Sequence, residues 1–418
     1  MPKASLRTLS SYACWILMIL ASWSWTAPAH GQDEEDADEG PSWIFDVYRG
    51  EGLRLKILDG DVTFLLRGGI QLDSVWISED SNIRNTVGDQ KDGTKLRRGR
   101  LALSGKLYYY FNFKAEYDFA LGNDGFKDVY VGISDLGTAA RLRIGQFKEP
   151  IGLEALTSSN HVTFIERSLM SSFTPGRTTG AMIFGSAVHD RVSWALGGFR
   201  SVRSISPDDA ERDLAATLRL TGLPWYRQDG RSLLHLGVAY SLRAAGDDMI
   251  AFRQYRDDVL EDDLVDTLTF EADRSQVFGT EAAWVWGPFS LQGEFALTAI
   301  ESSPAEDPVF FGYYFFASLF LTGEHRVYDV PNGRFDLVRP RRNFLEEGGG
   351  FGAWEIGARY SRVELSDGPI QGGRLSEGSV GINWYLNPNA RIMLDFSFLN
   401  KDGVGEVNTI KIRAQITF

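Results

Sequence analysis

From about residue 51 to the C-terminus, the chain is a series of short segments in which apolar and polar residues alternate, separated by Gly, Asn, Asp and Pro. The last segment shows this most clearly, because Ile410, Ile412 and Ile416 alternate with Lys411 and Arg413. Successive side chains of a β-strand point to opposite faces, so this period of two predicts strands with one apolar and one polar face.

Sixteen segments are long enough to be strands, starting near Val62, Leu96, Leu107, Phe126, Ala139, Thr178, Val192, Arg212, Ser232, Gln276, Pro288, Val309, Phe351, Arg374, Ala390 and Glu406. A soluble β-sandwich would also alternate, but apolar stretches of about ten residues match the tilted span of a membrane strand. Aromatic girdles near the strand ends are typical of outer-membrane barrels, and candidate girdle residues are Trp76, Tyr108, Tyr109, Trp284, Trp286, Trp384 and Tyr385. The sequence therefore predicts an all-β fold, a transmembrane antiparallel β-barrel of about 16 strands over residues 51–418.

The links between the segments suggest which end of the barrel is which. Tight links at 287–288 and 387–389 suit the periplasmic side, and longer links at 78–95 and 245–275 suit the outside. By the parity of the strand count, the link at 324–349 would be a long periplasmic turn. Either a strand pair is misassigned there or that turn is unusual.

The first 31 residues are predicted to be a cleaved signal peptide. Lys3 and Arg7 precede an apolar core at 12–25, and Ala27-Pro28-Ala29 supplies small residues for cleavage. The one cysteine, Cys14, lies in this segment, so we expect no disulfide in the mature chain. Residues 32–50 are predicted to be an acidic periplasmic leader. Export and a barrel together predict the outer membrane of a Gram-negative-type bacterium, surrounded by lipid and lipopolysaccharide.

The chain is acidic, with a formal net charge of −13, which argues against nucleic acid as a partner. The acidic excess lies in the leader and in 245–275, whereas the polar faces of the strands are rich in Lys and Arg. Strand phase directs toward the lumen a set of basic residues that we expect to line an anion path: Arg67, Arg98, Arg100, Lys106, Lys114, Arg141 and Arg143. Alternatively, these residues pair with inward acids and only solvate the wall.

The segment from Pro150 to Arg177 lacks strand alternation but carries apolar residues of its own, so we expect it to pack rather than extend into solvent. If it folds into the barrel, it forms a constriction loop with hydroxyl donors and cations from Thr157, Ser158, Ser159, Arg167 and Arg177. The alternative is a loop packed on the extracellular rim.

No motif indicates enzymatic chemistry. There is no Gly-x-Ser-x-Gly and no phosphate loop ending in Gly-Lys-Ser/Thr. His161 and Glu166 have poor spacing for a metal, and the acidic 245–275 link lacks the ordered ligands of a calcium loop. We expect a protein without catalytic activity, metal or cofactor.

Several ordered motifs resemble the phosphate-selective porin O and P family, namely Gly145-Gln146-Phe147-Lys148-Glu149-Pro150, Phe164-Ile165-Glu166-Arg167, Phe320-Leu321-Thr322-Gly323-Glu324 and Asn383-Trp384-Tyr385-Leu386-Asn387-Pro388. The resemblance covers about 60–418 and implies a sixteen-stranded trimeric porin, with its third external loop folded inward and basic residues along the anion path. Arg97-Arg98 resembles a basic pair of the family's pore, although alternation turns only Arg98 inward. The family's phosphate sites also use lysines, and Pro150–Arg177 has none.

These observations predict an outer-membrane porin for passive diffusion of small anions, with phosphate or polyphosphate as candidate solutes and a homotrimer as the assembly. A broader anion or organic-acid porin remains open. Further alternatives are a general or cation-preferring porin governed by the acidic loops, and a structural or adhesive barrel without an open pore.

Overall fold

The computed structural model describes residues 44–48, 52–57, 60–136, 140–200, 214–245, 249–254, 263–302 and 307–418. The predicted signal peptide lies outside these ranges, as do most of the predicted acidic leader and part of the acidic 245–275 link. Within the described ranges, no helix is long and apolar enough to cross a membrane.

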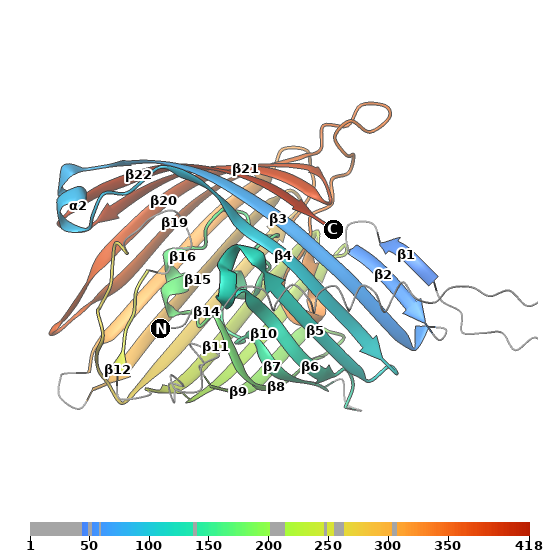
Figure 1. The fold of residues 1–418 in the computed structure, drawn as a ribbon, viewed down its shortest axis with the longest axis horizontal. Coiled ribbons are helices and arrows are strands. Elements are labelled where there is room, and N and C mark those ends of the chain that lie inside the picture. Colours follow the sequence, from blue (N-terminus) through green and yellow to red (C-terminus); the bar gives the residue numbers. More distant parts are fainter. Residues whose placement is uncertain are drawn as a thin grey trace, which may run out of the picture. The chain divides into compact units, whose positions relative to one another are not determined.

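Sixteen antiparallel strands close into a barrel (Figure 1): β3 (Val62–Glu79), β4 (Gly93–Leu107), β5 (Phe111–Asp118), β6 (Phe126–Ile133), β7 (Ala140–Lys148), β8 (Arg177–Ala187), β9 (Val192–Arg200), β10 (Leu214–Arg227), β11 (Ser232–Ala244), β14 (Arg274–Trp286), β15 (Phe289–Glu301), β16 (Val309–Phe320), β19 (Ala353–Asp367), β20 (Ile370–Asn387), β21 (Ala390–Lys401) and β22 (Gly405–Thr417). The last strand pairs with the first, with Arg413 opposite Asp73, so the barrel leaves no open edge. The sixteen strands predicted from alternation are confirmed.

Smaller elements complete the described chain. A short antiparallel pair, β1 (Ile44–Tyr48) and β2 (Gly52–Ile57), precedes the barrel. Strand β2 pairs antiparallel with the first residues of β3. The links contain two two-stranded sheets, β12 (Met249–Ile250) with β13 (Phe270–Glu271) and β17 (Tyr328–Asp329) with β18 (Arg334–Phe335). They also contain the helices α2 (Ser81–Thr86) and α3 (Leu153–Leu156), and 3₁₀ helices at Phe119–Asp124, Leu169–Phe173 and Val330–Asn332.

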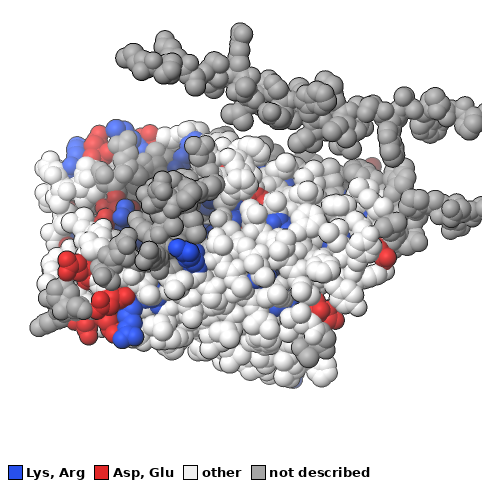
Figure 2. Space-filling model, turned by 60° about the horizontal axis from the view of Figure 1, so that its bottom comes forward, with Lys and Arg blue, Asp and Glu red and all other residues white. Residues whose placement is uncertain are grey.

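Polarity across the wall is inverted relative to a soluble protein. On β3, Ile70 is 57% exposed while its neighbour Gln71 is 1% exposed. The flank seen in Figure 2 is largely uncharged, and acidic and basic side chains gather toward one end. Alternation with the apolar side outward is what a barrel needs in lipid. Of the predicted girdle residues, Tyr385 instead points inward and donates to Glu355 at 2.8 Å.

The two ends of the barrel differ in their links. We call the end at which Phe418 lies beside Gly68 the turn end, and the opposite end the loop end. The link at 321–352, between β16 and β19, is long although it leaves from the turn end. It enters the barrel, where Arg219 on β10 donates to the carbonyl of Gly333 at 2.8 Å and Arg326 donates to Gln292 on β15 at 2.7 Å. No strand pair is misassigned, and this inner link adds a second inward segment to the one expected.

Candidate functional site

The segment at 149–176, which we call the inward loop, lies inside the barrel and is bound by its backbone to one wall. The carboxylate of Glu294 on β15 accepts the backbone N–H groups of Leu153 and Glu154, each at 2.7 Å. Asp395 on β21 accepts the N–H of Ile165 at 2.6 Å. Carboxylates that accept backbone N–H groups make strong hydrogen bonds, so inward acids fix the path of this loop.

Inward arginines bind the same loop through its carbonyl groups. Arg391 donates to Val162 at 2.8 Å, Arg413 donates to Ile165 at 3.0 Å, and Arg359 donates to the carbonyl of Glu166 at 2.8 Å. The backbone N–H and C=O groups of a loop buried in a barrel lose their hydrogen bonds to water. The arginine side chains supply hydrogen bonds in place of those to water.

Apolar side chains of the inward loop are buried against the same half of the barrel. Phe164, Leu169 and Phe173 are each at most 3% exposed and belong to a cluster with Phe310 of β16 and Leu375 of β20. Because this half is filled, the open part of the lumen lies along the other half. The inward loop therefore narrows the lumen and displaces it to one side.

The open part is a cavity of about 1960 Å³, lined chiefly by β3–β8, the inward loop and the inner link. Among the described residues, fifteen of its lining residues are basic: Arg67, Arg97, Arg98, Arg100, Lys114, Lys127, Arg143, Lys148, Arg167, Arg177, Arg219, Arg243, Arg253, Arg334 and Arg339. Six are acidic: Glu116, Asp128, Glu149, Glu166, Asp329 and Asp336. The lining therefore carries an excess of positive charge although the chain as a whole is acidic.

A β-bulge places two adjacent arginines in this lining. Gln71 pairs with Arg98 and Leu72 pairs with Leu96, so Arg97 is an extra residue in β4. Such a bulge resets the alternation of side chains. Arg97 and Arg98 are 5% and 6% exposed and both line the cavity, which strict alternation would have forbidden.

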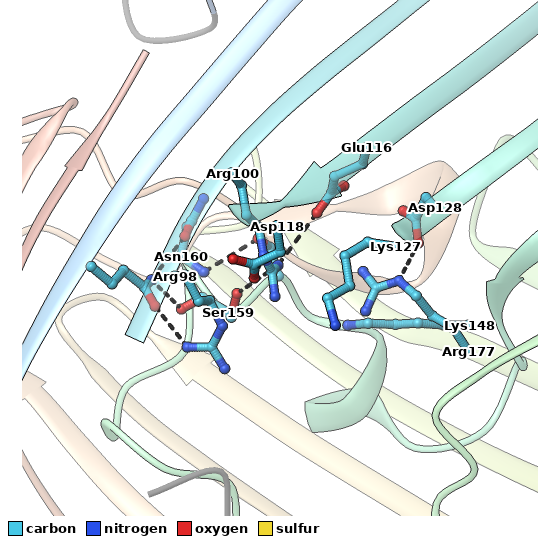
Figure 3. Close-up of polar contacts among 12 residues, drawn as sticks. Arg98, Arg100, Glu116, Asp118, Lys127, Asp128, Lys148, Ser159, Asn160 and Arg177 are labelled. Atoms are coloured by element: carbon cyan, nitrogen blue, oxygen red, sulfur yellow. Dashed lines mark hydrogen bonds and ion pairs between the residues drawn. The ribbon is translucent and has the colours of Figure 1, made fainter. Parts of the chain in front are cut away.

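The first half of a cationic cluster lies on β4 beside the inward loop (Figure 3). Arg98 donates to the side-chain oxygen of Gln71 at 2.6 Å. Arg100 donates to Asp118 at 2.7 Å and to the hydroxyl of Ser159 at 3.4 Å. The β4 arginines are thus held in position by neighbours on both the wall and the loop.

The second half comes from β6, β7 and β8. Asp128 lies 2.8 Å from the ammonium of Lys114 and 2.6 Å from the guanidinium of Arg177. Lys148, the last residue of β7, donates to the carbonyls of Ala155 and Thr157, the latter at 3.3 Å. Lys127 and Lys148 extend into the same region as Arg177 (Figure 3). We call Arg98, Arg100, Lys127, Lys148 and Arg177 the cationic cluster.

The structure brings together most of the predicted site residues. Those that line the cavity are Arg67, Arg98, Arg100, Lys114, Arg143, Ser158, Ser159, Arg167 and Arg177. Three are absent from its lining. Lys106 is exposed near the turn end of β4, and Arg141 donates to the carbonyl of Pro331 at 3.3 Å. Thr157 is 2% exposed and its hydroxyl donates to Leu153 at 2.8 Å, because it ends the single turn of α3.

Several lining residues were not predicted as site residues from the sequence. Lys148 lies two residues before Pro150, where the expected constriction loop begins, and Lys127 is the second residue of β6. Their positions beside the inward loop depend on how far β7 and β6 run before the chain turns. Arg334 lies on the inner link, whose entry into the barrel no local pattern indicates.

Two carboxyl groups in the loops are strongly perturbed. Burial alone would raise the pKa of Glu166, but the guanidinium of Arg97, with Lys411 and Arg413, holds it well below its usual range. A hydrogen bond from His161 lowers the pKa of Asp336 to about 2. His161 Nδ1 lies 3.1 Å from Asp336 Oδ1, so this contact joins the inward loop to the inner link.

The described part of the chain contains no group of three or more His, Cys, Asp or Glu side chains that could hold a metal ion. What the site offers is positive charge, hydroxyl and amide donors, and a continuous cavity. Such an arrangement can attract, partly dehydrate and pass an anion without covalent chemistry.

Comparisons with known proteins agree with this geometry. The sequence model of the phosphate-selective porin O and P family matches residues 66–418. Porin O of Pseudomonas aeruginosa is 25% identical over 379 residues, which cover 82% of this chain and 84% of that protein. An uncharacterized protein of Caulobacter vibrioides is 26% identical over 359 residues, 83% and 71% of the two chains.

Solved porin structures share the fold. An anion-selective porin from Comamonas acidovorans matches with a TM-score of 0.53 and 14% identity, over 85% of this chain and 100% of its own. OmpF of Salmonella typhi matches with a TM-score of 0.52 and 14% identity, over 90% of this chain and 100% of its own.

Proposed function

Because this chain belongs to the phosphate-selective porin O and P family, we propose that its barrel passes small anions, phosphate among them, by passive diffusion. It is an outer-membrane porin. The turn end would face the periplasm and the loop end the outside, and the working assembly would be a homotrimer surrounded by lipid and lipopolysaccharide.

The cationic cluster is the observation that carries this proposal. Its five basic side chains line the cavity on the side formed by β4, β6, β7 and β8, beside the inward loop. In a narrow passage with low-dielectric walls, fixed charges act on an ion far more strongly than they do in bulk water. Basic rings in such a passage favour anions.

Pairing with acids weakens this field without reversing it. Asp128 offsets part of the charge of Lys114 and Arg177, and Glu166 lies 3.6 Å from Arg97. Fifteen basic residues against six acidic ones still leave an excess of basic side chains in the lining. The acids hold the cations in position, which supports an anion path over a merely solvated wall.

Phosphate as a solute is supported by the donor types at the cluster. Lys127 and Lys148 supply the lysines that 150–177 lacks, and Ser158 and Ser159 add hydroxyl groups to the lining. A tetrahedral oxyanion accepts hydrogen bonds from guanidinium, ammonium and hydroxyl groups, and all three kinds of donor are present here.

The test is block of the chloride current by inorganic phosphate in planar bilayers that contain the refolded protein. We expect phosphate to block, and Lys148→Gln to raise the half-blocking concentration about tenfold through loss of one cation at close range. A chloride current that phosphate leaves unchanged would mean a general anion porin. The absence of any conductance would favour a structural barrel.

A further inference from the structure

Between the cationic cluster and the turn end, β6, β7 and β8 present rings and a guanidinium to the cavity instead of paired charges. Tyr130, Arg143, Phe147, Met182 and Phe184 all line the cavity, and we call them the aromatic wall. Contact between apolar rings and water is unfavourable, so an aromatic surface of this kind does not help a hydrated inorganic ion to pass.

Arg143 is held by rings rather than by a carboxylate. The central carbon of its guanidinium lies 4.2 Å from the centroid of the Tyr130 ring, 4.8 Å from that of Phe184 and 5.3 Å from that of Phe147. Its Nε is buried and has no hydrogen-bond partner among the residues that the structure describes. Arg177, by contrast, bonds to Asp128 at 2.6 Å.

The wall adjoins the cationic cluster along the direction of transport. Lys148 pairs with Arg177 in the register of β7 and β8, and Arg143 pairs with Met182 further along the same strands. Lys148 lies five positions after Arg143 along β7, about 16 Å at the usual rise of a strand. An anion released from the cluster toward the turn end therefore meets the wall next.

The inner link lies against the wall. Pro331 in this link accepts a hydrogen bond from Arg141 at 3.3 Å, and Arg141 in turn lies 4.6 Å from the centroid of the Phe184 ring. Arg334, also on the link, lines the same cavity. The space at the wall therefore has apolar faces and more than one cation.

We propose that the aromatic wall binds the planar, apolar part of an organic anion, so that aryl phosphates and aryl carboxylates are solutes of this channel. A guanidinium flanked by rings keeps its N–H edge available to an oxyanion, and a solute ring adds stacking and apolar burial against Tyr130 and Phe184. This inference rests on the proposed anion function and names a solute class within it.

The experiment compares the block of the chloride current by methyl phosphate and by phenyl phosphate, which carry the same anionic group. We expect phenyl phosphate to block at a concentration about tenfold lower, as one stacked and partly dehydrated ring would give. Phe184→Leu removes a ring while keeping an apolar side chain, and Arg143→Lys keeps the charge while removing the planar group. Either variant should bring the two blocking concentrations to within about twofold of each other.

Arg334→Gln is the matched control, because it removes a cation of the same cavity while leaving every ring and Arg143 unchanged, and it should weaken both blockers alike. Equal block by the two phosphates in the unaltered protein would overturn the inference, as would a phenyl preference that survives in both variants. Failure of the proposed function has a separate signature, a current carried by potassium that neither phosphate blocks.

Discussion

The Asp128 carboxylate lies 2.6 Å from the guanidinium Nε of Arg177, the first residue of β8 after the inward loop. The same carboxylate lies 2.8 Å from Lys114, so one acid holds two cations at the side of the cavity. This pairing offsets part of the positive charge and also holds the base of the inward loop to β6.

Asp128→Asn should raise the preference for anions, because it removes one negative charge and leaves both cations. Removal of one partly screened negative charge from the lumen should raise the chloride-to-potassium permeability ratio about two- to fivefold. The zero-current potential measures this ratio. Asp229→Asn, in an exposed turn, should leave it unchanged, and a fall in the ratio for Asp128→Asn would contradict the assignment.

The β-bulge of β4 predicts that positions 97 and 98 both face the lumen. The mature chain has no other cysteine if the segment with Cys14 is cleaved. Arg97→Cys and Arg98→Cys should therefore both react with an anionic, water-soluble thiol reagent and lose single-channel current in steps. Leu96→Cys, at a position 47% exposed on the outer face, should stay unmodified. Reaction at only one of the two positions would mean that alternation is unbroken.

Glu294 is predicted to anchor the inward loop. Glu294→Gln replaces one accepting oxygen with an N–H₂ donor, so one of the N–H groups of Leu153 and Glu154 loses its acceptor, at a cost of about 1–3 kcal/mol. We expect a more mobile loop, seen as greater open-channel current noise. Glu301→Gln is the control, because Glu301 lies on the same strand but bonds to exposed Arg274. Equal noise in the two variants would refute the anchoring role.

The contact between His161 and Asp336 should resist acid. The pKa of Asp336 is lowered to about 2, so this contact stabilises the fold above the ordinary carboxyl pKa and is lost only as the pH falls toward about 2. Asp336→Asn should therefore differ from the unaltered protein in open-channel noise at pH 7 and still at pH 3, where a carboxyl of ordinary pKa is mostly protonated. A difference that is present at pH 7 and lost at pH 3 would show an unshifted carboxyl.

Alternation in the sequence located all sixteen strands because each spans lipid, where every second side chain must be apolar. Strand phase also predicts that Arg98, Arg100 and Lys114 face inward, and all three line the cavity. Alternation alone turned Arg97 away from the lumen. The β-bulge that brings it inward depends on the pairing of β3 with β4, which the sequence pattern of β4 by itself does not indicate.

The positions of the two inward segments depend on contacts between distant residues. Polar and apolar residues of the inward loop predicted that it packs, but its path follows from Glu294, Asp395 and Arg413, which lie more than 100 residues away in sequence. The inner link is held by Arg219, which is 114 residues from Gly333, and by Gln292, which is 34 residues from Arg326. Sequence periodicity carries no signal for such contacts.

The most direct test of the central claim is the zero-current potential of the refolded protein in a planar bilayer under a KCl gradient. The positive lining predicts a chloride preference, reduced by Arg98→Gln and by Lys148→Gln. A potassium preference, or an anion preference that neither substitution changes, would contradict the account.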